Sequence, residues 1–355
     1  MYRRSPAIAF YAVADTLIAL DTHTGIRSAM PPGLAALLCL LGTEWSAEDL
    51  AGRWSDWGDV SALRAILDAL VLGGFVERSD RPAVRRDGDW KTESAIFHFA
   101  TRDPQYASDP LEQFGRLRRK AARVAPPAPV KHVAGVQTPL TAPQSLPGLT
   151  EPLRARRTWR QFSKDPLAAS DLATLLHLTF GVQLWGRGAS GPIVLKTSPS
   201  GGARHPIEAS VIALNVAGLR RGVYHYAAAD HALVDLNQRI TRRRLIELLA
   251  NQHYFGDAAV VIVMSAVFAR STWKYEHSRV YRAVLAEAGH LGQTFCVVAT
   301  ALQLAPFCTM AFRDSPLDEL LGIDGTTEAS MYVVGVGRRP AGTIAYPGRA
   351  RPSRP

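Results

Sequence analysis

Cysteine is scarce in this chain, and the three residues present form no pattern. Cys39, Cys296 and Cys308 are odd in number and widely spaced within 355 residues, and no C-x-x-C occurs. A disulfide framework needs paired cysteines, and a structural zinc site needs closely spaced ligands. The sequence therefore excludes a disulfide-stapled secreted domain and predicts no metal site. Reduced thiols are the expected state.

Long apolar runs are also absent. No stretch reaches the roughly 18 residues of a membrane-spanning helix. The basic N-terminus, residues 1–6, is not followed by a leucine-rich core with a cleavage site. We therefore expect no membrane association and no signal peptide, and the predicted location is the cytoplasm.

Acidic side chains are fewer than basic ones. Asp and Glu number 31 against 41 Lys and Arg, which gives a net charge of +10. Such a charge is compatible with DNA, an anionic cofactor or an acidic peptide as partner. The arginines are scattered, however, and those at 242–244 open an amphipathic helix after Thr241, where a solvated face is expected. Charge alone therefore does not predict nucleic-acid binding.

A length of 355 residues predicts about two domains. Residues 1–82 are predicted to form a winged-helix domain, with strands over 7–20, helices over 34–41 and 46–54, a third helix from Asp59 or Ser61 to Leu72, and a closing strand at 75–78. This order resembles the PqqD-like leader-recognition domains of peptide-modifying enzymes. Winged helices also read DNA, but the third helix carries only Arg64 and Asp68 as charged residues. We therefore predict a domain that binds a leader peptide or a partner protein.

Residues 83–150 are predicted to be a proline-rich connector. Proline density between Pro126 and Pro152 opposes regular structure there. Before it lie an isolated apolar patch, residues 96–99, and a basic helix over 113–123. Residues 151–345 alternate helices with strands, including a buried strand at 258–264, a long helix at 287–304 and a last buried strand at 331–337. The predicted fold class is α+β.

A loop rich in glycine and polar side chains separates two apolar runs of the third region. It reads Ser198-Pro199-Ser200-Gly201-Gly202-Ala203-Arg204-His205-Pro206. Adjacent glycines allow backbone to approach a flat ligand closely, with N–H donors at short range. An ordinary surface turn is the alternative interpretation, because glycine and proline are turn residues by default.

Two arginine clusters flank this loop in the sequence. In the first cluster, Arg156, Thr158 and Arg160 are spaced two residues apart. On an extended segment their side chains point the same way, so together they form a phosphate-binding group, called here the phosphate grip. The second, Arg338-Arg339, directly follows the last buried strand, where ligands of α/β sheets lie. Taken singly, each cluster is better explained as a solvated surface, because arginine pairs mostly lie there.

The order of these motifs resembles that of the nitroreductase-like flavoenzymes, and most closely their SagB-type dehydrogenase branch, which includes the azoline oxidases. The resemblance extends to Gly222–Tyr226, Trp273–Glu276 and Glu287–Gln293. It implies an FMN-binding α/β sandwich, usually a homodimer. By position it implies that the FMN phosphate contacts Arg156, Thr158 and Arg160 with Arg338 or Arg339, and that the cofactor also contacts Pro199, Ser200, Gly201, Gly202 and Gln293. One departure is Gln303, at a turn position where the family usually has glycine.

The resemblance also assigns catalysis to Lys274 and Tyr275. Oxidising an azoline ring requires removal of a proton from carbon and delivery of a hydride to flavin. A tyrosine is a poor base at its usual pKa of about 10, and a neighbouring ammonium favours the phenolate. Consecutive residues do not face each other on a helix, so we predict that the pair lies on an irregular segment. Without the resemblance, a solvated lysine and a packing tyrosine would be favoured, and His205 and His290 are expected to be structural.

The functional hypothesis is therefore an FMN-dependent dehydrogenase of a ribosomally made peptide, assisted by a leader and by a maturation partner such as a cyclodehydratase. Dehydrogenation of another peptide residue is an alternative. Further alternatives are an NAD(P)H-dependent reductase of small nitro or quinone compounds, a flavin-dependent DNA-binding regulator and a scaffold without activity. The N-terminal domain favours the peptide hypothesis, because a small-molecule reductase does not need it.

Overall fold

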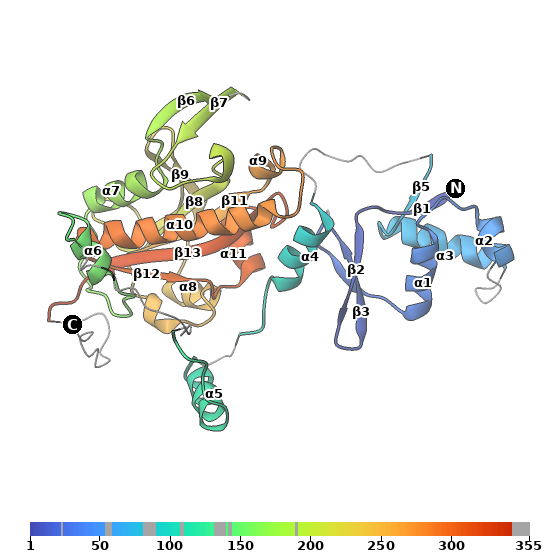
Figure 1. Cartoon of the computed structure of the whole chain (residues 1–355), viewed down its shortest axis with the longest axis horizontal. Helices are drawn as coiled ribbons and strands as arrows, with labels where there is room; N and C mark the ends of the chain where they lie inside the picture. The colour runs from blue at the N-terminus through green and yellow to red at the C-terminus, as the bar shows by residue number, and fades with distance from the viewer. Residues whose placement is uncertain are drawn as a thin grey trace. The chain divides into compact units, whose positions relative to one another are not determined.

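The computed structural model describes residues 1–22, 24–53, 59–80, 90–106, 110–130, 140, 144–188 and 191–342 (Figure 1). The chain folds into two compact units. The N-terminal unit comprises Met1–Arg102 and Phe268–Ala283, and the second unit comprises Asp103–Val267 and Val284–Pro355. Residues 268–283 therefore belong with the N-terminal unit although they lie far away in sequence. The domain boundaries after residues 82 and 150 remain predictions, and residues 343–345 lie outside the described residues.

Three helices and two small sheets make up the first part of the N-terminal unit. The helices are α1 (Pro32–Leu40), α2 (Ala47–Arg53) and α3 (Val60–Leu72). The strands are β1 (Tyr2–Arg4), β2 (Ile8–Val13), β3 (Thr16–Asp21), β4 (Arg27–Ala29) and β5 (Val76–Arg78). β1 pairs with β5, while β2, β3 and β4 form an antiparallel meander. The predicted helices are present, and Trp54, the predicted end of the second, lies outside the described residues.

Side-chain caps determine where two of these helices begin. Asp59 accepts the N–H of Ala62 at 2.8 Å, and the Ser46 hydroxyl accepts the N–H of Asp49 at 3.0 Å. Such caps satisfy N–H groups that have no partner within the helix. Leu63, Leu67 and Leu70 of α3 are buried in one cluster with leucines of α1, so this unit has its own hydrophobic core.

Helix α4 (Thr92–Thr101) completes the N-terminal unit. The sequence analysis predicted a connector here, with residues 96–99 as an isolated apolar patch. In the structure Ala95, His98 and Phe99 form one buried face, and His98 contacts Tyr281, 183 residues later. The patch looked isolated because its partners are remote in sequence.

The second unit is built on a six-stranded sheet of order β10-β9-β8-β11-β13-β12, with every neighbouring pair antiparallel. Its strands are β8 (Ile207–Ala213), β9 (Gly222–Ala227), β10 (Ala232–Gln238), β11 (Val260–Val267), β12 (Leu304–Thr309) and β13 (Glu328–Arg338). A separate hairpin consists of β6 (Leu184–Gly188) and β7 (Gly191–Leu195). The helices are α5 (Pro110–Arg123), α6 (Thr150–Ala155), α7 (Ala169–Phe180), α8 (Arg242–Leu248) and α11 (Asp314–Leu321). Helix α9 (Ala269–Thr272) lies within residues 268–283 of the N-terminal unit. Helix α10 (Val280–Ala301) begins in that segment and continues into the second unit.

Helices cover both faces of this sheet. On one face Val333 belongs to a cluster with Leu245 of α8 and Leu317 of α11. Tyr332 points to the other face because successive strand residues alternate. A Cβ at Gly292 of α10 would lie 2.6 Å from its ring, and Figure 1 shows α10 running along the sheet beside β13. The unit is thus a helix–sheet–helix sandwich, in agreement with the predicted fold class.

The connector contains more helix than predicted. The basic helix expected over 113–123 is present as α5. The described residues of the proline-rich stretch, 124–130, 140 and 144–149, form neither helix nor strand, as predicted. Residues 83–89, 107–109, 131–139 and 141–143 of the predicted connector lie outside the described residues. Within the described part of the chain, we find no helix with the length and apolar character needed to cross a membrane.

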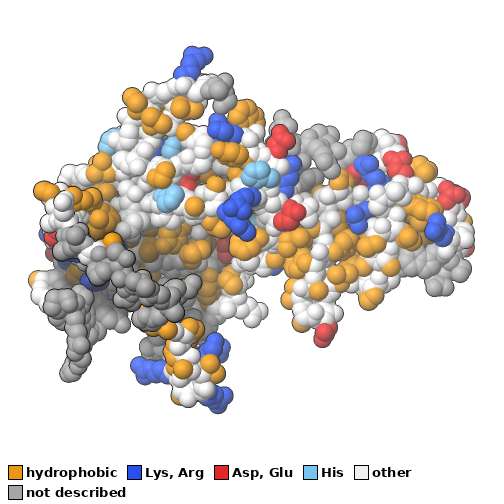
Figure 2. All heavy atoms as spheres, in the orientation of Figure 1, with side chains coloured by type: hydrophobic (Ala, Val, Ile, Leu, Met, Phe, Trp, Pro, Cys, Tyr) orange, Lys and Arg blue, Asp and Glu red, His pale blue; other side chains and the backbone are white. Residues whose placement is uncertain are grey.

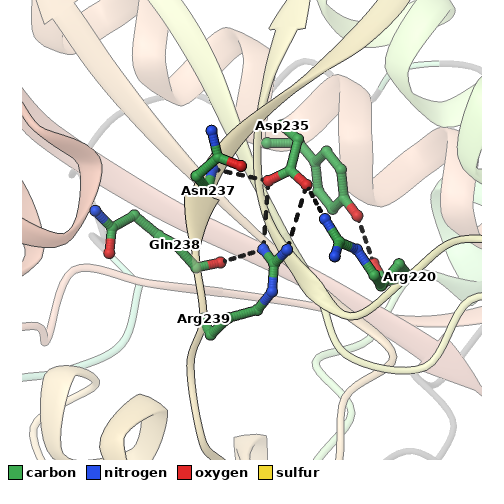
Figure 3. A network of polar contacts seen from close by, with 6 residues as sticks. Arg220, Asp235, Asn237, Gln238 and Arg239 are labelled. Carbon is green, nitrogen blue, oxygen red and sulfur yellow. Dashed lines mark hydrogen bonds and ion pairs between the residues drawn. The ribbon is translucent and has the colours of Figure 1, made fainter.

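Many basic side chains away from the candidate site are paired with carboxylates. Arg220 and Arg239 both contact Asp235 on β10 (Figure 3). The pKa of Asp235 is lowered to about 2, first by the N–H of Asn237 and then by these two guanidiniums. On α8, Arg242 binds Asp257 and Arg243 binds Glu247. Lys and Arg side chains on the face shown in Figure 2 lie in separate groups.

Candidate functional site

The glycine loop has a left-handed backbone conformation at its centre, which favours a residue without Cβ. Residues Gly201–Ala203 form a short 3₁₀ turn in which Gly202 has φ 64° and ψ 24°. This left-handed region is open to glycine at little cost, and Ala203 and His205 also have positive φ angles. Gly201 and Gly202 are both exposed.

Side chains from one face of α10 hold this loop in place. Ser198 Oγ lies 2.7 Å from Thr294 Oγ1, and His290 Nδ1 lies 3.2 Å from the carbonyl oxygen of Pro199. Glu287 Oε1 lies 3.8 Å from Nδ1 of His205. Residues 287, 290 and 294 are neighbours on a helix surface because they are three and four apart. The two histidines contact the loop backbone and α10, which fits the structural role that the sequence predicts for them, and Thr294 is a contact that the sequence analysis missed.

Glu287 is a buried carboxyl group at the base of the loop, with 3% of its surface exposed. Burial raises its pKa, and a hydrogen bond with Ser200 opposes that shift. The Ser200 hydroxyl also accepts the N–H of His205 at 2.9 Å. Ser200 thus links the loop backbone to α10. Gln293 lies exposed on the same helix, next to Thr294.

The first arginine cluster follows α6 on a segment with neither helical nor strand structure. Arg157 is exposed and donates to the carbonyl oxygens of Arg154 and Arg156 at the end of α6, and Trp159 is 7% exposed. Arg156 and Thr158 are half-buried, and Arg160 is exposed. Burial therefore sets only Trp159 apart, whereas Arg157 differs from the three residues predicted to grip phosphate by the carbonyl partners that it already has.

Hydrogen bonds to the sheet bring the two arginine clusters together. The N–H of Trp159 donates to the carbonyl of Pro306 on β12 at 2.9 Å, and the N–H of Ser163 donates to the carbonyl of Arg338 at 2.9 Å. The Arg339 guanidinium lies 5.4 Å from the centre of the Trp159 ring. The rule for parallel sheets that suggested a ligand near Arg338 does not apply, because this sheet is antiparallel. The clusters meet through main-chain pairing instead.

Arg339 also fixes the turn after α10. It donates to the carbonyl of Leu304 at 2.8 Å, to Gln303 Oε1 at 2.7 Å and to the carbonyl of Thr300 at 3.3 Å. Gln303 has φ 59°, so it adopts the left-handed conformation that glycine usually supplies. Its side chain accepts a hydrogen bond from Arg339, which a glycine at this position could not do.

Lys274 and Tyr275 lie between α9 and α10, outside regular structure, as predicted. Lys274 Nζ lies 5.5 Å from the centre of the Tyr275 ring, and the main-chain N–H of each residue donates to the carbonyl of Ser271. Lys274 is exposed and Tyr275 is half-buried. Both belong to the N-terminal unit, whereas the glycine loop and the arginine clusters belong to the second.

Comparison with known proteins decides the family. The Nitroreductase family model matches residues 153–338. The chain is 31% identical over 191 residues to the nitroreductase-named protein MJ1384 of Methanocaldococcus jannaschii, and the match covers 54% of this chain and 91% of that protein. This chain belongs to the nitroreductase family.

Two further relatives of this nitroreductase come from Rhizobium leguminosarum bv. trifolii. The trifolitoxin-processing protein TfxB is 30% identical over 150 residues, which cover 40% of this chain and 39% of TfxB. The trifolitoxin operon protein TfxC is 24% identical over 317 residues, which cover 83% of this chain and 87% of TfxC. The match to TfxC therefore extends well beyond the length of the nitroreductase region.

A thiol pair lies close to the first arginine cluster of this nitroreductase. Cys308 on β12 accepts hydrogen bonds from the Cys296 thiol and the Tyr332 hydroxyl. These bonds, the Cys296 bond first, together with the charge of Arg156, lower the pKa of Cys308. The same bond, and then burial, raise the pKa of Cys296. Cys308 is thus the thiol of the pair that is favoured to ionise.

Proposed function

We propose that this nitroreductase is an FMN-dependent dehydrogenase of a ribosomally made peptide and that it oxidises azoline rings to azoles. The observation that carries the proposal is the arrangement of the second unit, where two distant arginine clusters meet and an exposed double-glycine turn is anchored to α10. Cationic side chains suit a phosphate, and exposed glycine backbone suits a flat ring. FMN has both parts, and FMN dependence is typical of the family.

The residues present fit that cofactor by the chemistry of their donors. Arg156, Thr158 and Arg160 would hold the phosphate, with the exposed Arg338 beside them. Arg339 would contribute mainly by holding the turn after α10, since it already donates to three acceptors. Residues 199–202 and Gln293 would contact the rest of the cofactor.

In the proposed reaction an azoline loses one proton and one hydride and becomes an azole. FMN, when bound, supplies the acceptor for the hydride. Tyr275 would take the proton from the ring carbon, and the neighbouring Lys274 ammonium would stabilise the phenolate that performs this step. The exposed position of Lys274 and the half-buried position of Tyr275 leave both accessible to a peptide.

The names of the relatives support a peptide as substrate, because TfxB is a trifolitoxin-processing protein. The N-terminal unit offers a place to bind one. A groove of about 600 Å³ lies between the end of α3 and β5, and Leu72 and Val76 are among its lining residues. Leu72 is 92% exposed, and among the described residues β5 pairs with β1 alone. An extended leader could add to the free edge of β5. A homodimer and a cyclodehydratase partner belong to the same proposal.

The direct test is oxidation of a peptide by the purified full chain reconstituted with FMN. We expect flavin absorbance to co-purify or to appear after addition of FMN, and an azoline-containing peptide with its leader to lose two hydrogen atoms per ring by mass spectrometry. Azoline peptide left unchanged, together with NAD(P)H-dependent reduction of nitro or quinone compounds, would favour the small-molecule alternative. Protein that never takes up flavin would contradict both.

A second test addresses the phosphate grip without measuring activity. Because its pKa is lowered, the Cys308 thiolate persists as pH falls below the usual thiol range, and Cys308 is expected to react with iodoacetamide at neutral pH. FMN bound through its phosphate would offset the charge of Arg156 and cover the site, so its addition should slow alkylation of Cys308 several-fold. Exposed Cys39 is the internal reference. If the rate of Cys308 alkylation is the same with and without FMN, the phosphate binds elsewhere.

A further inference from the structure

The candidate catalytic pair is carried by a segment that packs with the N-terminal unit. Residues 268–283 interrupt the nitroreductase region in sequence, yet they form one compact unit with Met1–Arg102. The unit proposed to bind the peptide therefore also holds Lys274 and Tyr275.

Helix α4 holds this segment at both ends. At the C-terminal end, Tyr281 Oη lies 2.9 Å from His98 Nδ1, and Ser278 donates a hydrogen bond to Glu93. At the other end, Phe268 packs against the His98 ring with 5.2 Å between ring centres. His98, Phe268 and Tyr281 are all less than 10% exposed. The pair lies between these two anchors.

Trp90 closes the aromatic cluster around His98. Its ring stacks on His98 with 4.7 Å between centres and lies 4.5 Å from the centre of Phe268. Buried rings packed in this way leave little freedom to the backbone that carries them. Between the anchors, the main-chain N–H groups of Lys274 and Tyr275 both bond to the carbonyl of Ser271. The anchors thus fix both ends of the short segment that carries the pair.

The same helix contacts the wall of the peptide groove. Asp21 and Thr24 line the groove, and a Cβ on the following residue, Gly25, would come within 2.6 Å of the Phe99 ring. Phe99 lies in the last turn of α4 and directly follows His98. One helix therefore touches the groove wall on one side and the catalytic segment on the other.

We propose that α4 is a positioning element of the active site, acting through the bonds from His98 to Tyr281 and from Glu93 to Ser278. This inference rests on the proposed function for its catalytic meaning. The N-terminal unit is then part of the catalytic machinery and does more than tether the peptide. Positioning of a base within a fraction of an ångström strongly affects rate, so loosening the segment lowers kcat without weakening peptide binding in the groove.

The test uses the full chain with the double substitution Ser278→Ala and Tyr281→Phe, which removes two hydroxyl groups and keeps the aromatic ring. A net loss of roughly 1 kcal/mol per hydrogen bond, about 2 kcal/mol for the two bonds, corresponds to about thirtyfold faster hydrogen exchange at the amides of Lys274 and Tyr275. We expect a similar fall in kcat, with flavin content and the KM for peptide unchanged. Thr101→Ala is the matched control, because that hydroxyl donates to the carbonyl oxygens of Phe97 and His98 within α4 itself.

Each outcome decides the inference. Unchanged exchange at these amides would show that α4 does not hold the segment. Faster exchange with unchanged kcat would show that the segment needs no positioning. If the wild-type chain binds flavin but oxidises no peptide, the proposed function fails, and hydrogen exchange still determines whether α4 fixes residues 268–283.

Discussion

Replacing Lys274 by alanine is expected to lower peptide oxidation by about 10²- to 10⁴-fold, the usual contribution of a positioned acid–base group. The Lys274 ammonium lies 5.5 Å from the centre of the Tyr275 ring, and the variant removes this positive charge from beside the residue proposed to take the proton. Flavin content should not change, since Lys274 is not among the residues proposed to bind FMN. Single-turnover oxidation of an azoline peptide, followed by mass spectrometry, measures the loss.

Arg279→Ala is the matched control for this experiment. Arg279 is an exposed cation in the same segment, so its removal tests whether local charge alone explains the effect. Lys274→Arg keeps a positive charge with a different shape and should recover part of the rate. Full activity in Lys274→Ala would remove the pair from the mechanism while leaving the flavin site in place.

The double substitution Arg156→Gln and Arg160→Gln is expected to weaken FMN binding by about 10²- to 10⁴-fold. Each guanidinium would form a charge-assisted hydrogen bond with phosphate worth about 1.5 to 3 kcal/mol, so the pair contributes roughly 3 to 6 kcal/mol. Neither side chain is fully buried, and the fold should survive. Titration of apoprotein with FMN, followed by flavin fluorescence, gives the affinity.

Arg157→Gln is the control from the same run of sequence. Its guanidinium donates to two carbonyl oxygens at the end of α6, so the change should cost helix stability and leave FMN affinity within a few-fold. Riboflavin, which lacks the phosphate, provides a second check. Its affinity should be nearly the same in the double variant and in the wild type, and an equal loss for both ligands would contradict a phosphate grip.

Local patterns in the sequence predicted local structure well. The helices expected to begin at residue 46 and at Asp59 or Ser61 are present, and Ser46 and Asp59 cap them. The irregular segment around Lys274 is also present. In the first arginine cluster the period of two holds only in part, because Trp159 is buried but Arg157 is exposed.

Features that depend on remote contacts could not be predicted. Residues 96–99 gave no sign of their partners near residue 281, because no sequence pattern links segments so far apart. Strand β12 was not predicted, and only its first residue, Leu304, fell within the helix expected over 287–304. Pro306 argues against a strand except at a sheet edge, where β12 lies. Thr294 could have been found from its spacing of four and seven from His290 and Glu287.

The return of residues 268–283 to the N-terminal unit has a practical consequence for anyone dissecting this protein. A recombinant fragment that starts at residue 151 would retain Phe268 and Tyr281 but lose Trp90 and His98, the rings on which they pack. Aromatic surface that becomes exposed to solvent in this way promotes aggregation. Truncation boundaries chosen from the family match alone would therefore damage the piece that they were meant to isolate.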